Sequence, residues 1–581
     1  EGEQDKYDIY NLGEVTYEAR INLQRWGGWC NTVMGLEENF CLRFVQDDFK
    51  GQLQLSGWGG TLMVPTGGIA VSLNKWTHVA AVFDGPNKKV SIYIDGVLAC
   101  SADTNKTSLD LTQVYQDDSF RIANSCNDGR QLKGYISEAR VWAKALNGND
   151  LKNNMWVNEN EIYRSHKDND GNGYQGDVYG YNFVFDTGVI SWDDVSDTGH
   201  GTHVAGVIAA QNNNGIGISS IAGGNADIPG VKIMSCQIFS GNDATSGAIT
   251  TSAEAIKYAA DNGAVIIQCS FGSKAGTYTS DSAYERGSGV QYNAIKYFIE
   301  SQNCDAVGGG VVIFAAGNDA TAMSGYPGAY HDYISVTSFS PDYLPAYYTN
   351  YGPGCNISAP GGDYKISADA AKTYAEVLST VPSELSEYNG ADYGFMQGTS
   401  MACPHVSGVA ALGLSYAAKL RRHFTADEFK ALLYETTTPI DDYMSGMKLY
   451  YRYVAEVGLN QPMQLTLANY RNQMGVGQVN AARLLNAVSG NGKQVSFPNL
   501  YISLGKEVKA IPANYFLGGE TLTYTVSIAD TAVATASLEG AKLTVRGLKA
   551  GTTKASITSS KGETHNFNIT VRKTANGNGW L

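Results

Sequence analysis

The stretch of sequence that most constrains this chain is residues 398–405, which read Gly-Thr-Ser-Met-Ala-Cys-Pro-His. An apolar run at residues 409–414 follows, and the combination predicts a buried helix that begins beside Ser400. Pro404 fits the first turn of such a helix, where a residue without an N–H group is tolerated. The Ser400 hydroxyl would then lie near the positive end of the helix dipole. By itself, the pattern is equally typical of a serine that only caps a helix.

Two further segments would give this serine chemical partners. Residues 200–210 predict a helix of small residues that opens on His200. Residues 311–318 indicate a buried parallel strand that ends in Gly-Asn, so Asn318 would follow its carboxyl end. A serine hydroxyl is a poor nucleophile unless a base lies next to it. The two segments contain a histidine and an asparagine that could assist Ser400, but their spacing in the sequence does not show that they lie next to it.

These three segments resemble those of the subtilase family of serine proteases, in that family's order, and the resemblance extends over residues 153–490. It implies that Ser400 is the nucleophile, His200 the general base and Asn318 the side-chain oxyanion donor. It also implies a strand that binds the substrate backbone and a pocket for the P1 side chain. The strand would be Ser270, Phe271 and Gly272, the pocket wall Ala315, Ala316 and Gly317, and the pocket floor Gly325, Tyr326 and Pro327.

The composition of this pocket predicts the substrate preference. Glycine and alanine leave room, so we expect large apolar or aromatic P1 side chains to be accepted. Asp319 directly follows Asn318, and a carboxylate at the rim would attract cationic side chains. Because it would face solvent, the attraction should be worth no more than about 1 kcal/mol and should weaken with salt. The alternative is that Asp319 points away and contributes nothing.

A serine triad also needs a carboxylate that holds the histidine in one tautomer. In the subtilase family this aspartate lies in an Asp-Thr-Gly or Asp-Ser-Gly turn after a central strand. Asp186 stands in such a turn, but only 14 positions before His200, which is too few to leave the sheet, form the intervening strand and return. Residues 177–183 resemble that intervening strand, and Asp197 lies even closer to His200. We therefore find no triad Asp in this chain.

Two explanations remain for the carboxylate. Its strand lies upstream of Glu1, with the N-terminal domain inserted in a loop, or the strand is lost and the fold is a degenerate protease that serves as an adhesive or binding protein. Domains tolerate such insertions. Loss of a central strand would expose buried backbone groups and apolar surface, so the physical argument favours the first explanation.

Overall composition narrows the class of protein. The 581 residues suggest three or four domains. With 56 acidic and 42 basic residues the net charge is −14, which argues against a nucleic-acid partner. No run of 18 apolar residues suggests a membrane span. A charged fraction of only 17%, with 66 glycines and 36 tyrosines, is typical of an extracytoplasmic protein that is secreted, periplasmic or on the cell surface. Because the sequence begins at Glu1 without a methionine or signal peptide, we expect further sequence upstream.

Residues 1–152 show the alternation of antiparallel strands, with an Asp95-Gly96 turn between two of them. The segment resembles laminin-G and concanavalin-like jelly rolls, which implies a glycan or calcium ligand, although no ligand residue can be assigned. A packing or spacer module is an equal alternative. The domain contains Cys30, Cys41, Cys100 and Cys126, and one or two disulfides are expected if it is exported.

Residues 168–173 place Asp168, Asp170 and Asn172 at alternate positions, with a glycine at the sixth. This is the opening of a calcium-binding loop, to which Asp177 could add a ligand. Tyr179 stands at the twelfth position, where such loops carry a bidentate acid. The pattern is equally typical of a structural calcium site and of an acidic surface turn without metal.

From residue 200 to 490 short strands alternate with helices, which predicts a parallel sheet covered on both faces. Residues 493–581 return to strand alternation and resemble a bacterial immunoglobulin-like sandwich, for which a spacer or adhesive role is the default. The chain is thus predicted to be multidomain, with a jelly roll at residues 1–152, an α/β peptidase domain at 153–492 and a β-sandwich at 493–581. The predicted function is a secreted or surface serine endopeptidase for protein or peptide substrates, without an organic cofactor.

Overall fold

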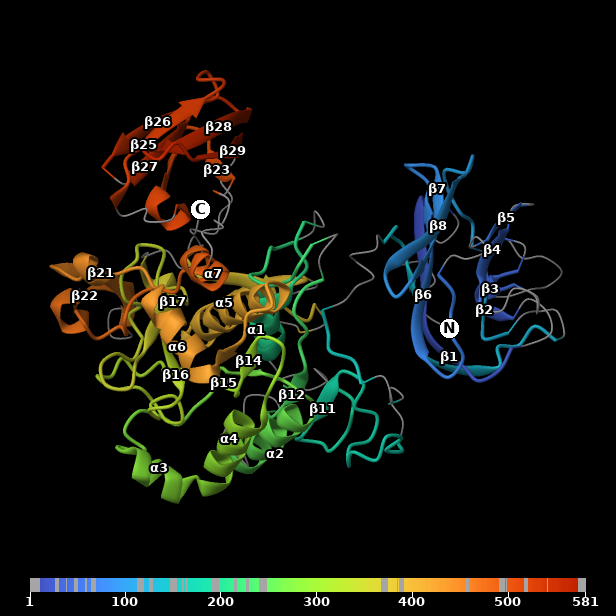
Figure 1. Ribbon diagram of the computed structural model, residues 1–581, viewed down its shortest axis with the longest axis horizontal. Helices are drawn as coiled ribbons and strands as arrows, with labels where there is room; N and C mark the ends of the chain where they lie inside the picture. The colour runs from blue at the N-terminus through green and yellow to red at the C-terminus, as the bar shows by residue number, and fades with distance from the viewer. Residues whose placement is uncertain are drawn as a thin grey trace. The chain divides into compact units, whose positions relative to one another are not determined.

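The computed structural model shows two compact units (Figure 1). The first unit comprises Glu1–Ser191, Gln211–Ile216 and Gly224–Gln237, and the second comprises Trp192–Ala210, Gly217–Gly223 and Ile238–Leu581. The residues described are 11–26, 31–37, 39–45, 51–57, 60–63, 69–111, 120–124, 129–146, 154–158, 161, 166–190, 198–213, 217–225, 229–239, 248–366, 375–383, 385, 391–454, 459–490, 497, 499–516, 521–540 and 542–572. Among these residues, no helix has the length and apolar character that a bilayer span requires.

Two antiparallel five-stranded sheets form most of the first unit. One has the order β10-β1-β6-β7-β8 and the other β5-β4-β3-β2-β9. The first sheet consists of β10 (Gly134–Trp142), β1 (Glu14–Leu23), β6 (Trp76–Asp84), β7 (Lys89–Ile94) and β8 (Val97–Asp103). The second consists of β5 (Gly60–Met63), β4 (Leu53–Gly57), β3 (Phe40–Phe44), β2 (Thr32–Leu36) and β9 (Arg121–Ile122).

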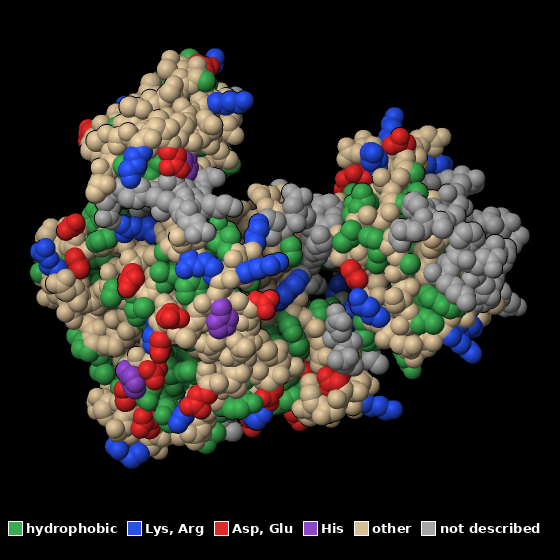
Figure 2. Space-filling view, viewed as in Figure 1, with side chains coloured by type: hydrophobic (Ala, Val, Ile, Leu, Met, Phe, Trp, Pro, Cys, Tyr) green, Lys and Arg blue, Asp and Glu red, His purple; other side chains and the backbone are tan. Residues whose placement is uncertain are grey.

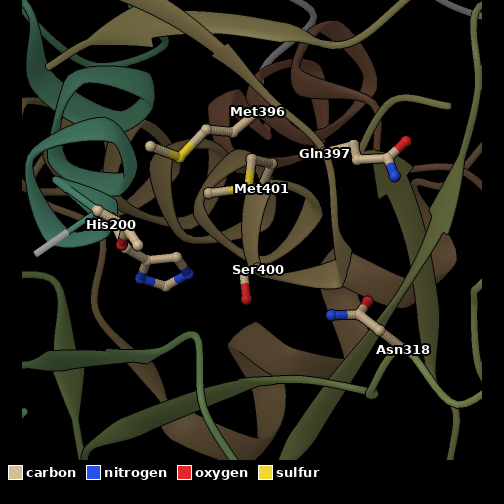
Figure 3. A pocket seen from close by; sticks show the side chains of 7 residues that line it. His200, Asn318, Met396, Gln397, Ser400 and Met401 are labelled. Atoms are coloured by element: carbon tan, nitrogen blue, oxygen red, sulfur yellow. The ribbon is translucent and has the colours of Figure 1, made fainter. Parts of the chain in front are cut away.

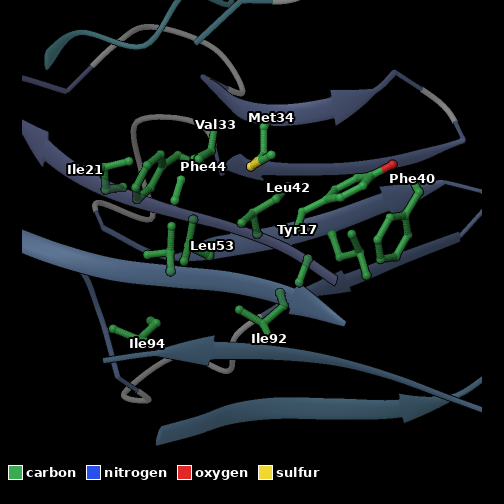
Figure 4. Packing of buried hydrophobic residues seen from close by; sticks show 14 of the residues in the cluster. Tyr17, Ile21, Val33, Met34, Phe40, Leu42, Phe44, Leu53, Ile92 and Ile94 are labelled. Atoms are coloured by element: carbon green, nitrogen blue, oxygen red, sulfur yellow. The ribbon is translucent and has the colours of Figure 1, made fainter. Parts of the chain in front are cut away.

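Alternate residues of these strands fill one hydrophobic core, as the period-two pattern predicts. Tyr17 and Ile21 of β1 are fully buried, and Tyr17 packs against Phe40 of β3 with ring centroids 4.8 Å apart (Figure 4). The turn between β7 and β8 has φ of 49° at Asp95 and 67° at Gly96. Positive φ at both positions is the requirement of a tight hairpin turn, so the predicted Asp-Gly hairpin is confirmed.

The cysteines of this domain leave the disulfide prediction open. Cys41 is buried in β3, and Cys100 in β8 is a free thiol. Cys30 and Cys126 lie outside the described residues.

The rest of the first unit contains a short parallel pair, β11 (Gly180–Asn182) and β12 (Ser235–Gln237). β11 lies in the segment that the sequence analysis interprets as the strand before the catalytic histidine. The acidic loop at residues 168–177 precedes it directly.

A four-stranded parallel sheet lies at the centre of the second unit, in the order β13-β15-β16-β17. Its strands are β13 (Ile266–Cys269), β15 (Val311–Ala315), β16 (Ile334–Phe339) and β17 (Ile357–Pro360). All of β15 and β16 is buried, as expected for parallel strands covered on both faces. The helices are α1 (His200–Ala209), α2 (Ala248–Asp261), α3 (Asp281–Gly287), α4 (Gly289–Ser301), α5 (Thr399–Lys419), α6 (Ala426–Glu435) and α7 (Ala481–Ser489).

The long helix α5 organises this unit. It contacts all four strands of the sheet and packs against α1 and α7 (Figure 1). Ala402, Val406 and Ala410 of α5 are completely buried in the same core as Ile313 and Val336 of the sheet. Ser400 therefore lies at the start of a helix that is buried in the core of the unit.

Several small elements surround the sheet. They include a parallel pair of β14 (Val307–Gly308) with β20 (Phe424–Thr425), an antiparallel pair of β18 (Val377–Thr380) with β19 (Tyr393–Met396), and the single 3-10 turns η2 (Tyr364–Ile366), η5 (Asp441–Tyr443) and η6 (Leu467–Tyr470). The sequence analysis did not predict the antiparallel hairpin of β21 (Met447–Val454) and β22 (Leu459–Thr466). The run of tyrosines in β21 could have predicted this strand, because tyrosine is enriched in strands.

The C-terminal segment forms two sheets around one core. One has the order β23-β29-β28-β25 and the other β24-β27-β26. Leu543, Val545, Ile557 and Ile569 are fully buried between them. The elements are β23 (Leu500–Ser503), β24 (Glu507–Ala510), η7 (Pro512–Tyr515), β25 (Tyr524–Ile528), β26 (Ala534–Glu539), β27 (Lys542–Gly547), β28 (Gly551–Ser559) and β29 (Thr564–Arg572).

Acidic and basic side chains are interspersed on the visible face of the space-filling view (Figure 2).

Candidate active site

The backbone at the start of α5 places Ser400 in its first turn. Gly398 caps the helix with φ of 149°, and its carbonyl accepts hydrogen bonds from the N–H groups of Met401 at 3.0 Å and Ala402 at 3.2 Å. The N–H groups of a first helical turn have no partner within the helix. The Ser400 N–H is therefore positioned as a donor next to its own hydroxyl.

Pro404 does not lie in the first turn, so that prediction is wrong. The helix begins at Thr399, because Gly398 supplies the cap, and Pro404 is an interior residue of the second turn. Since proline has no N–H, the carbonyl of Ser400, four residues earlier, has no helical donor. That carbonyl instead accepts a hydrogen bond from Ser270 Oγ at 2.7 Å. The proline thus allows the segment after β13 to bind the turn that carries Ser400.

The three residues of the proposed catalytic set lie around one pocket. His200 comes from the start of α1, Asn318 from the loop after β15 and Ser400 from the start of α5. Figure 3 shows the His200 imidazole, the Ser400 hydroxyl and the Asn318 amide on the side chains that line this pocket. Thr198, Met396, Gln397 and Met401 complete the lining.

The orientation of the Asn318 amide is fixed by α5. Its Oδ1 accepts hydrogen bonds from the N–H and the hydroxyl of Thr399, both at 2.9 Å, which leaves Nδ2 to face elsewhere. A methyl group added at Gly398 would lie 3.6 Å from this Nδ2 and 3.5 Å from the Ser400 nitrogen. Both donors therefore border the same small space, and glycine at position 398 keeps it open.

Two other histidines lie close to this site but are not suited to act as the base. His203 Nε2 bonds the carbonyl of Val377 at 2.9 Å, and His405 Nδ1 bonds the carbonyl of Met401 at 2.8 Å. Burial lowers the pKa of each imidazole to about 4, so both are neutral and confined. Of these three histidines, His200 is the one on the pocket wall.

Cys403, three residues after Ser400, is a packing residue. Its side chain is fully buried, and its Sγ lies 3.6 Å from the Ile313 carbonyl. Burial raises the pKa of this thiol to about 11, so the reactive thiolate is not formed at neutral pH.

The predicted substrate-backbone strand lies beside Ser400. The Ser400 hydroxyl donates to the Ser270 carbonyl at 3.3 Å, so the segment directly after β13 contacts the Ser400 side chain. The Phe271 ring packs edge-on against Phe314 of β15, with centroids 5.6 Å apart, and belongs to the fold. An added methyl group at Gly272 would lie 3.2 Å from the Tyr326 carbonyl.

The predicted wall and floor of the P1 pocket are joined by backbone hydrogen bonds. Gly325 donates to the carbonyl of Ala316 at 2.8 Å, and Ser273 donates to that of Tyr326 at 2.7 Å. A side chain at Gly325 would collide with the Ser273 carbonyl, at 2.5 Å. Ala315 and Ala316 are buried, and Gly317 has φ of 108°, a conformation that favours glycine.

Asp319 is exposed, and its carboxylate accepts the Ala275 N–H at 3.1 Å. It therefore links the loop after β15 to the segment after β13.

Asp186 lies past β11 in an exposed turn, with φ of 54°, as its spacing predicts. Its carboxylate accepts a hydrogen bond from the Tyr181 hydroxyl at 2.8 Å. Asp197 lies outside the described residues.

The four predicted calcium ligands share one loop of the first unit. The exposed carboxylate of Asp168 accepts the N–H groups of Gly173 at 2.8 Å and Gly171 at 2.7 Å, which lower its pKa. Asp177 is fully buried and accepts the Asn172 amide at 2.9 Å. Asp170 accepts the Asn158 amide at 2.8 Å.

The sequence analysis missed one acid of this cluster. Glu161 is fully buried, and a carboxylate oxygen of Glu161 lies within 4.8 Å of oxygens of Asp168 and Asp170. It also accepts the Asp170 N–H at 3.2 Å and the Gly176 N–H at 3.1 Å. Glu161 precedes the loop, so the spacing within residues 168–179 carries no signal for it.

Comparison with known proteins identifies the family of the chain. The model of the subtilase family matches residues 157–461, more than half of the chain, so the chain belongs to the subtilase family of serine proteases. A model of the concanavalin A-like lectin/glucanase superfamily matches residues 6–152, which confirms the predicted kind of N-terminal domain.

Several individual relatives are bacterial proteases. The thermophilic serine proteinase of Bacillus sp. (strain AK1) is 31% identical over 276 residues, which are 48% of this chain and 54% of that protein. The major intracellular serine protease of Bacillus subtilis (strain 168) is 30% identical over 313 residues, 53% of this chain and 82% of that protein. A solved protease of Pseudoalteromonas arctica PAMC 21717 is 29% identical with a TM-score of 0.36, and the match covers 50% of this chain and 71% of that one. This chain spans about half the length of several curated relatives that it matches.

Proposed function

We propose that the chain is a serine endopeptidase that hydrolyses internal peptide bonds of proteins or peptides. The observation that carries the proposal is the meeting of Ser400, His200 and Asn318 at one pocket. In the proposed reaction His200 takes the Ser400 proton as Oγ attacks the peptide carbonyl carbon. The Ser400 N–H and Asn318 Nδ2 then donate to the oxyanion. His200 protonates the leaving amine, and water releases the acyl group from Ser400.

The test is incubation of the full chain with a library of quenched fluorescent peptides, with the products identified by mass spectrometry. An endopeptidase produces fragments cut within the peptides. Trimming from one end only, or intact peptides after prolonged incubation of folded protein, would contradict the proposal.

We propose that the triad carboxylate belongs on a strand that pairs with β13. Support comes from β13, which is an edge strand of its sheet among the described residues. Three of its four residues are nevertheless apolar: Ile266, Ile267 and Cys269. Apolar strands of this kind are normally covered, since a free edge invites unwanted pairing.

For P1 specificity, the proposal keeps the preference for large apolar or aromatic side chains, with lysine tolerated better at low salt. Asp319→Asn should lower the ratio of lysine to phenylalanine cleavage by no more than about fivefold, because an exposed charge is worth at most about 1 kcal/mol. The ratio is measured at low and high salt, with Asp305→Asn as a control for the loss of one charge. Strict cleavage after small residues would refute this specificity. It would also be refuted if the ratio of lysine to phenylalanine cleavage changed neither with salt nor in Asp319→Asn.

We propose a structural calcium site formed by Asp168, Asp170, Asn172 and Asp177, with Glu161 as a further oxygen ligand. Carboxylate and amide oxygens are the ligands that calcium prefers. Calcium at 100 times its Kd should add about 2.7 kcal/mol to the stability of the unit.

The expected result is a lower thermal midpoint in EGTA for the wild-type chain and no EGTA effect for Asp168→Asn/Asp170→Asn. Asp103→Asn, an exposed acid of the same unit, serves as the control and should behave like wild type. A wild-type midpoint that is unchanged by calcium or EGTA would rule out the site.

The remaining proposals rest on the sequence. The peptidase domain at residues 153–492 is flanked by the lectin-like domain at 1–152, with a glycan as its proposed ligand, and by an immunoglobulin-like module at 493–581. The low charge content supports an extracytoplasmic location.

A further inference from the structure

A buried lysine anchors the β21–β22 hairpin to the second unit. Lys448 is only 3% exposed, and its ammonium group donates to Ser340 Oγ at 2.6 Å and to the Pro345 carbonyl at 2.8 Å. A third bond reaches Asp363 at 3.0 Å, and the Asp342 carboxylate lies 3.6 Å from the same nitrogen. An ammonium has three hydrogens, so the three bonds satisfy it completely. We call the four oxygen-bearing residues the ammonium cage.

The charges of the ammonium cage require a cation. Asp363 is fully buried, and the cage contains two carboxylates for one ammonium. A buried carboxylate without a counter-charge is strongly unfavourable. Four oxygens from two loops around one positive charge also resemble the surroundings in which proteins bind metal cations. Lys448 therefore occupies a place that a free cation could fill.

The cage is connected to the pocket through one tyrosine. Asp363 accepts the Tyr347 N–H at 3.2 Å, and the Tyr347 ring stacks on Tyr450 of β21, with centroids 5.7 Å apart and planes 11° apart. The Tyr347 hydroxyl accepts a hydrogen bond from Gln397 Nε2 at 3.2 Å. The other end of this amide accepts the Tyr364 N–H at 2.9 Å. Gln397, a pocket residue, is thus held from both ends by residues next to the cage.

We propose that Lys448 is a positioning residue for the hydrolysis: it acts as a tethered cation that docks the β21–β22 hairpin and thereby orients Gln397 at the pocket. The activity part of this inference rests on the proposed endopeptidase function. It follows that a small free cation can replace the ammonium when the lysine side chain is removed.

The experiment uses Lys448→Ala in the full chain, with methylammonium as the probe because it carries the same charged group. We expect Lys448→Ala to lower the thermal midpoint and to reduce kcat/KM by roughly tenfold, the size of effect typical of residues coupled to a site through a network. Methylammonium should restore both quantities in the variant and leave the wild type unchanged. Should Lys448→Ala fail to fold alone, refolding in methylammonium is the expected rescue.

Matched controls separate cation binding in the ammonium cage from the orientation of Gln397. Tetramethylammonium has the same charge but no N–H group, so it should not restore Lys448→Ala. Arg452→Ala removes an exposed cation of the same strand and should behave like wild type. Tyr347→Phe keeps the ring but removes the bond to Gln397, so it should lower kcat/KM while the thermal midpoint stays near that of wild type.

Three results would overturn the inference. They are wild-type stability of Lys448→Ala, equal effects of the two ammonium ions, and an unchanged kcat/KM in Tyr347→Phe. The rescue of the thermal midpoint is measured without a substrate. It therefore tests whether a free cation binds in the ammonium cage, independently of whether the chain hydrolyses peptides.

Discussion

Ser400→Ala is expected to lower kcat for peptide hydrolysis by about 10⁶-fold in a protein that carries the complete triad, the size of loss established for the nucleophile of subtilisin, a protease of the same family. The reason is that the hydroxyl forms the covalent bond, and no other group on the pocket wall can replace it. The nearby Cys403 thiol is buried and protonated. KM should change little, because binding does not need the hydroxyl.

His200→Ala should cost about as much, and the double variant should cost little more, because nucleophile and base act as one unit. The control is Ser407→Ala, which removes another hydroxyl of α5 that bonds the Cys403 carbonyl at 3.1 Å. That variant should retain activity. Activity of Ser400→Ala within tenfold of wild type would exclude Ser400 as the nucleophile.

Asn318→Ala is expected to lower kcat by about 10²–10³-fold, a range whose reference case is again subtilisin. The Asn318 amide donates most strongly when the carbonyl oxygen of the substrate carries negative charge. Loss of this hydrogen bond should therefore lower kcat and leave KM unchanged. Stopped-flow or steady-state kinetics on one good peptide substrate separate the two constants.

The control for this prediction is Asn318→Asp, which keeps the size of the side chain but removes the donor. It should be at least as impaired as Asn318→Ala. A raised KM with normal kcat in either variant would indicate that Asn318 only binds substrate in its ground state.

The parts of the fold that local patterns determine were predictable. Alternation at residues 15–23 gave β1, and the apolar run at 311–315 gave β15. The small residues after His200 gave α1, within one residue of its observed end. The sequence placed Ser400, His200 and Asn318 in one site only through resemblance, because no spacing rule brings such distant residues together.

What the sequence did not reveal depends on contacts between distant segments. The start of α5 is set by the Gly398 backbone, so Pro404 alone gave the wrong turn. Glu161 reaches the acidic loop through tertiary folding. Lys448 is an ordinary lysine in sequence and becomes distinctive only when the loops after β16 and β17 surround it.

The most direct test of the central claim is labelling of the folded full chain with a fluorophosphonate, followed by peptide mapping. Such reagents react with a serine only when a base activates it. We predict one label per chain, on the peptide that contains Ser400, with labelling retained in Ser407→Ala and abolished in Ser400→Ala. Folded protein that takes up no label, or takes it up on a different residue, would contradict the assignment of Ser400 as the activated nucleophile.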